Sequence, residues 1–212
     1  MSRTLRGPAI VIVALWALMP QGALAGQSID VNTLNPVPPA DYTCVGTGGG
    51  AICRVSRTED LSGPSGFLCG DAASPIELVG VDAIDQLEFT RIYDADLNLV
   101  TRTVHEHFSV TYLNPVTGLS VESTQIAEVT STFTTPGDLD SGTFTQRGVV
   151  KFFAPGAGVL LIDVGRAVLT TDGNVLVQSG QHQQFDRYFS GDTSVLEGVC
   201  EAVGSPGTPP LP

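Results

Sequence analysis

The sequence predicts an all-β domain of long strands joined by hairpins, with little helix. Three observations lead to this fold class. Apolar residues recur at every second position over long stretches, clusters of glycine, proline, asparagine and aspartate separate these stretches, and threonine, valine and phenylalanine dominate them. We expect the strands to close into a single antiparallel β-barrel, because an open sheet of this size leaves edges that pair with other molecules. A β-sandwich is the alternative.

The stretch from residue 100 to residue 112 shows most clearly the pattern of a half-buried strand. Its apolar side carries Val100, Val104, Phe108, Val110 and Tyr112. Its other side carries Thr101, Thr103, His105, His107, Ser109 and Thr111. Successive side chains of a strand point to opposite faces of a sheet, so we expect the first set in the core and the second in water.

Turn signals divide the following chain into further strands. Residues 114–118 (NPVTG) predict a turn, after which the apolar residues Leu119, Val121, Ala127, Val129 and Phe133 all fall on odd positions. Residues 144–152 continue the pattern up to a turn at 155–158 (PGAG), and residues 159–164 (VLLIDV) form the next apolar run. A hairpin signal at 171–174 (TDGN) leads into a last strand, and residues 192–199 favour one short helical turn.

The first 25 residues have the pattern of a signal peptide. Arg3 and Arg6 precede an apolar run over 9–19, and residues 23–25 (ALA) fit the cleavage rule, with Gly26 as the new N-terminus. We therefore expect a secreted, extracellular protein, or alternatively a periplasmic one, without a transmembrane anchor after cleavage. Residues 26–43 predict an extended or disordered lead-in, residues 44–204 the β-barrel domain, and residues 205–212 a disordered tail.

The charge balance argues against a nucleic-acid partner. The chain carries a net charge of −12, and removing residues 1–25 takes away two arginines and no acid, which moves it to −14. Lys151 is the only lysine. A surface of this sign repels phosphates, and no cluster of basic residues is present to neutralise them.

The four cysteines predict two disulfides, because an even number in an oxidising compartment pairs. The spacing favours Cys44–Cys53, with five residues of glycine-rich chain (GTGGG) between them, which leaves Cys69–Cys200. A zinc site is the competing interpretation, but the chain has no C-x-x-C pair and no cysteine near a histidine.

The histidines are weak candidates for a metal site. His105 and His107 lie two residues apart, on one face of a strand, and His182 on the last predicted strand would complete a set of three. Both members of the pair fall on the threonine-rich face, however, so we predict an exposed polar strand face and neither a bound metal nor another cofactor.

Charged residues on apolar strand faces are the candidate ligand-binding residues. Arg102 and Glu106 lie on the same side as Val104 and Tyr112, and Arg166 lies on the same side of its strand as Leu160, Ile162, Val164 and Val168. Buried charges are costly unless they are paired. They form either a structural ion pair near the barrel mouth or, with Tyr112, the polar groups of a ligand-binding lumen.

Three segments resemble a set of small secreted bacterial proteins of unknown function. They are residues 114–118 (NPVTG), 155–166 (PGAGVLLIDVGR) and 173–185 (GNVLVQSGQHQQF). The resemblance implies a calycin-like or allene-oxide-cyclase-like β-barrel, and it brings no functional residue with it.

From these observations we expect a secreted binding module for a small apolar or amphipathic ligand, or for a surface partner. One alternative is an enzyme of the cyclase or isomerase kind, in which Glu106 acts with Arg102 or Arg166 in the lumen. The other is a structural envelope protein, which a lumen filled by Phe108, Phe133, Phe144 and Phe152 would favour.

Overall fold

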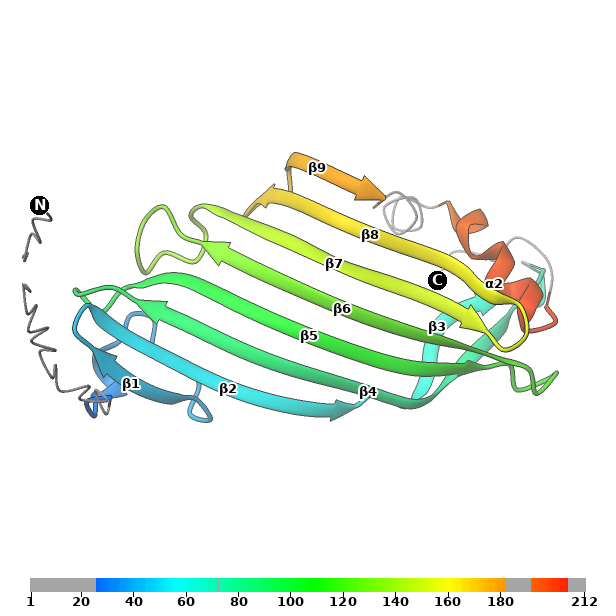
Figure 1. The fold of residues 1–212 in the computed structure, drawn as a ribbon, viewed down its shortest axis with the longest axis horizontal. Helices are drawn as coiled ribbons and strands as arrows, with labels where there is room; N and C mark the ends of the chain where they lie inside the picture. The colour runs from blue at the N-terminus through cyan, green and yellow to red at the C-terminus, as the bar shows by residue number, and fades with distance from the viewer. Residues whose placement is uncertain (1–25, 72, 182–191, 206–212) are drawn as a thin grey trace, which may run out of the picture.

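The computed structural model describes residues 26–71, 73–181 and 192–205, and in these residues the chain forms one antiparallel sheet of nine strands (Figure 1). The strands are β1 (Thr43–Thr47), β2 (Gly50–Asp60), β3 (Gly63–Cys69), β4 (Ile76–Tyr93), β5 (Leu99–Leu113), β6 (Ser120–Thr132), β7 (Thr143–Ala154), β8 (Gly158–Thr170) and β9 (Val175–Gln181). Within the described residues, three short helical segments accompany them: η1 (Val31–Thr33), η2 (Thr193–Leu196) and α2 (Glu197–Ala202). The predicted all-β class is confirmed.

The sheet is open, whereas the sequence predicted a closed barrel. Its strands follow the order β1-β2-β4-β5-β6-β7-β8-β9, with β3 also paired to β4, so β1 and β9 form the two edges of the described sheet. The edge at β1 is extended by an isolated bridge between Gln27 and Gly46. The lead-in, residues 26–43, therefore covers part of the edge at β1, although the sheet does not close.

The two faces of the sheet differ in what they contact. On β5, Val110 and Tyr112 are buried, and Val104 and Phe108 are half-buried, while His105 on the other side is exposed. We call the face that carries Val110 and Tyr112 the inner face, and the face that carries His105 the outer face. The alternation predicted for residues 100–112 is confirmed.

Two separate cores lie on the inner face, one at each end of the sheet. At one end, β3, η2 and α2 pack on Tyr112, Val121 and Phe152. At the other end, Leu34 of the lead-in packs with Tyr93 and with residues of β2, β5 and the loop after β6. Both cores contain a disulfide: Cys69–Cys200 joins β3 to α2, and Cys44–Cys53 joins β1 to β2. Both predicted pairings are confirmed.

Residues 26–43, predicted as extended or disordered, follow a defined path over the second core. Leu34 is 2% exposed, and the Tyr93 hydroxyl donates a hydrogen bond of 2.9 Å to the backbone oxygen of Pro36. The side chain of Asn35 donates to that of Asn98 at 2.8 Å. The lead-in is therefore part of the domain's packing.

Several predictions fall on residues that the structure does not describe. These are the signal peptide at 1–25, His182, and all of the tail except Ser205. In the described residues, no helix is long and apolar enough to cross a membrane.

Candidate functional site

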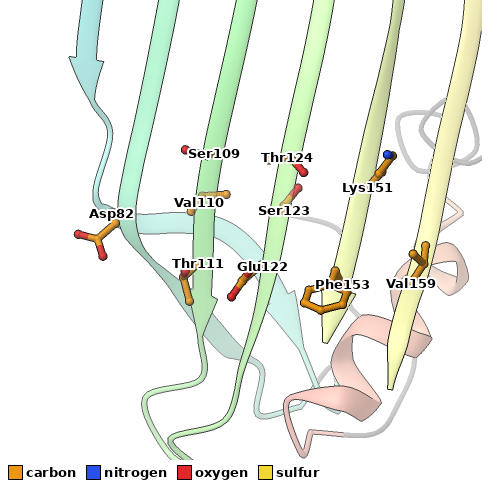
Figure 2. A pocket seen from close by; sticks show the side chains of 10 residues that line it. All are labelled: Asp82, Ser109, Val110, Thr111, Glu122, Ser123, Thr124, Lys151, Phe153 and Val159. Atoms are coloured by element: carbon orange, nitrogen blue, oxygen red, sulfur yellow. The ribbon is translucent and has the colours of Figure 1, made fainter. Parts of the chain in front are cut away.

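A hollow of about 400 Å³ lies on the outer face, near the end of the sheet where β3 and α2 pack on the other side (Figure 2). This volume falls within the range of about 300–1,000 Å³ that is usual for small-molecule sites. The lining residues come from β4 to β8: Asp82, Ser109, Val110, Thr111, Glu122, Ser123, Thr124, Lys151, Phe153 and Val159.

Two β-bulges shape the opposite walls of this hollow. On β4 the register shifts between Val81 and Ile84, so that Asp82, at φ 50°, reaches the rim while Ala83 turns into the core. On β8 a second bulge leaves Leu160 without a partner on β7 and sets Val159 opposite Phe153. Bulges re-aim side chains, and they are enriched next to functional sites.

The apolar wall of the hollow consists of Phe153 and Val159. Phe153 is 41% exposed and Val159 is 59% exposed, although both are large apolar residues in a regular sheet. Ile162 and Val164 extend this surface along β8. These exposed apolar side chains thus border the hollow on one side.

The polar wall offers hydroxyl groups and both signs of charge. Ser109, Thr124 and Lys151 are neighbours across β5, β6 and β7 in one row of the sheet, and Glu122 lies in the next row beside Phe153. In the described chain the ion pairs join Arg57 to Asp41 and Glu128 to two partners, so Lys151 takes part in none of them. Its ammonium group is therefore available to a ligand.

The predicted histidine pair lies on the outer face, outside the hollow. His105 Nδ1 lies 3.3 Å from Glu128 Oε2, and Arg147 Nη2 lies 2.6 Å from Glu128 Oε1. The hydrogen bond from Arg147 holds the pKa of Glu128 below its usual value. Among the described residues there is no group of three or more His, Cys, Asp or Glu side chains that could hold a metal ion.

Arg166 does not share a face with the other predicted ligand-binding residues. It lies opposite Arg147, is exposed on the outer face, and has Ile162 and Val164 on the same side. The side of β8 that faces the core instead carries Leu161 and Asp163. The prediction that Arg166 lies in a lumen with Glu106 is therefore wrong.

Arg102, Glu106 and Tyr112 do lie on the inner face, in three different environments. Tyr112 is a core residue that stacks on Phe152 with ring centroids 5.8 Å apart. Arg102 donates to Ser131 Oγ at 3.4 Å, beside a smaller hollow of about 170 Å³. Glu106 is half-buried at mid-strand. Four residues of strand span about 13 Å, so the backbone positions of Arg102 and Glu106 are too far apart for one small reacting group.

The phenylalanines predicted to fill a lumen belong to the two end cores and their margins. Phe152 and Phe133 are buried in different cores, and Phe108 packs against the first of these. Phe144 lines the smaller hollow beside Arg102. Aromatic packing thus stabilises the ends of the sheet.

Asp85 and Arg91 are among the charged inner-face residues that were not singled out from the sequence. Asp85 lies on β4 diagonally opposite Glu106, and Arg91 lies opposite Arg102. Burial raises the pKa of Asp85, and the nearby charge of Glu59 adds to the rise. Arg91 stacks over the ring of Tyr42, 5.1 Å from its centroid. The mixed periodicity of residues 76–87, caused by the bulge at Asp82, hid Asp85 from pattern analysis.

Comparison with protein-family models, curated protein sequences and solved structures finds no match to this chain. The resemblance to small secreted bacterial proteins therefore stays a prediction.

Proposed function

We propose that this protein is a binding module for a small amphipathic ligand, and that the outer-face hollow is its binding site. The observation that carries the proposal is that exposed Phe153 and Val159 line one hollow of about 400 Å³ together with Lys151, whose ammonium group has no ion-pair partner among the described residues. The apolar half of a ligand would cover the two apolar side chains, and its polar half would bond to the hydroxyls and charges.

The charges of the hollow favour a neutral or zwitterionic polar group. Lys151 offers one positive charge, whereas Glu122 and Asp82 offer two negative charges. A purely anionic head group would gain from Lys151, but it would be repelled by both carboxylates and by the negative charge of the whole chain. Hydroxyl groups of a ligand can accept from the ammonium and donate to the carboxylates at the same time.

The test uses n-octyl glucoside as a neutral amphipathic probe and octanoate as an anionic probe, both below micelle formation. Amide chemical shifts should change for residues 122–124, 151–153 and 159 on addition of octyl glucoside, and octanoate should bind more weakly. Phe153→Ser should weaken octyl glucoside binding about tenfold, because the variant loses the transfer free energy of a large apolar side chain.

Ile126→Ser is the matched control, because Ile126 is a large apolar residue of the same face, 57% exposed and outside the hollow. It should bind octyl glucoside like the unsubstituted protein. Shifts that spread over the whole outer face, or equal losses in the two variants, would refute the assignment.

We also propose that the protein works outside the cytoplasm. Two disulfides support this, since such bonds persist in oxidising compartments, and so does the signal-peptide pattern of residues 1–25. N-terminal sequencing of protein from the culture medium of its source should begin at Gly26. An intact Met1 on a cell-retained protein would contradict the proposal.

A further inference from the structure

Two carboxyl groups on the inner face, on the side of the sheet away from the hollow, are close enough for the charge of one to act on the other. Asp85 pairs in register with Phe108, and Glu106 pairs with Leu87, so the two acids are diagonal neighbours on β4 and β5. Diagonal side chains of adjacent strands lie within reach of each other when they are long. Glu106 is half-buried here between its cross-strand neighbours Leu87 and Ala127.

Asp85 has an acceptor atom without a donor. The residue is 8% exposed, and its Oδ1 is buried and accepts no hydrogen bond. A buried polar atom without a partner destabilises the fold, so a protein that retains one needs a reason. A donor supplied by a ligand would remove this cost.

Among the described residues, neither Asp85 nor Glu106 takes part in an ion pair. Glu59 on β2 pairs with Asp85 and adds a third negative charge. Arg57 on the same strand directs its guanidinium to Asp41, with Nη2 at 2.8 Å from Oδ2. Across the sheet, Glu106 bonds to the uncharged side chain of Gln125.

We propose that Asp85 and Glu106 form a second ligand site, which takes the ammonium group of an organic amine with an apolar body. An ammonium carries three donors, enough to serve both carboxylates at once. The apolar body would lie on Leu87, Val104 and Ala127, which share the inner face with Glu106. Metal ions fit less well, because the described residues contain no metal-binding group of three or more ligands.

The titration of the carboxyl pair supports this assignment and gives it a pH signature. Burial raises the pKa of Glu106, Gln125 opposes the rise, and the charge of Asp85 adds to it. Burial likewise raises the pKa of Asp85. An ammonium ligand binds the deprotonated pair, so binding should release protons in weak acid and become tighter as the pH rises.

The experiment uses n-octylamine, which is protonated at neutral pH, with n-octanol and octanoate as probes of the same chain length. Calorimetry should give tighter binding of octylammonium than of octanol or octanoate, and octylammonium alone should change the amide shifts of residues 85–87 and 104–108. The double variant Asp85→Asn and Glu106→Gln should lose about tenfold or more in affinity. Glu88→Gln, at an exposed carboxylate of the same strand opposite His105 and outside both proposed sites, should bind octylammonium unchanged.

Three results would overturn the proposal. They are absence of octylammonium binding, equal binding of octanol, and unchanged affinity in a folded double variant. If the double variant does not fold, the unsubstituted protein still decides the matter. Its affinity for octylammonium must rise as the pH increases from about 4, where ordinary carboxyl groups titrate, to neutrality, with proton release in calorimetry, and a flat profile would refute the site.

Discussion

Removing the disulfide Cys69–Cys200 should cost about twice as much stability as removing Cys44–Cys53. The first bond closes a sequence separation of 131 residues and the second a separation of 9. In the chain-entropy treatment these loops give about 5 and about 2.5 kcal/mol at 25 °C. Burial acts in the same direction, because both sulfurs of the long bridge lie in the core, whereas Cys44 is half-buried.

The assay compares two double variants, one with Cys69→Ala and Cys200→Ala and the other with Cys44→Ala and Cys53→Ala. Alanine is used in place of serine so that the substitutions bury no hydroxyl group. Urea unfolding should give a lower midpoint for the variant that lacks Cys69–Cys200, and a steeper slope because its unfolded state expands more. Equal free energies of unfolding, or the reverse order, would refute the reasoning that the long bridge holds the last helix to the sheet.

Three further perturbations test the packing. Leu34→Ala should lower the free energy of unfolding in urea by about 2–5 kcal/mol. Leu61→Ala is the control, because Leu61 is 51% exposed, and it should change this free energy by no more than about 0.5 kcal/mol. Similar losses in the two variants would contradict a packed lead-in. Gly148→Ala should destabilise by about 1–3 kcal/mol because its Cβ would lie 2.5 Å from a backbone oxygen of β6, unlike Gly48→Ala, which meets nothing within 4 Å. Glu106→Gln should stabilise the fold at neutral pH, since a raised folded-state pKa means that stability falls as the pH rises through it. This gain in stability should vanish in acid, where Glu106 is protonated. A gain that does not depend on pH would contradict a carboxylate that is destabilised by burial.

Local patterns predicted much of the fold. Strands β5 and β6 alternate between apolar and polar positions over most of their length, so their faces could be assigned from the sequence. Of the apolar residues at odd positions, Val121, Ala127 and Phe133 are buried, whereas Leu119 is 51% exposed. The short disulfide followed from its glycine-rich loop, and the long one followed by elimination. The alternation and the short disulfide depend on residues close together in the chain, which a sequence pattern can show.

The rest depends on register shifts that the patterns do not show. Residues 159–164 are apolar at all but one position, so periodicity could not tell that Leu161 is buried and Ile162 exposed. The unpaired Leu160 then moves Val159 beside Phe153. Because a bulge shapes each of the two opposite walls, the hollow could not be predicted from the sequence. The predicted lumen was on the other face of the sheet.

The most direct test of the account is native mass spectrometry of the protein purified from its source under mild conditions. We predict a bound small molecule that survives in Ile126→Ser and is lost in Phe153→Ser, because only the second residue lines the hollow. A mass equal to that of the disulfide-bonded polypeptide alone, or an adduct that Phe153→Ser leaves in place, would contradict the proposed binding site.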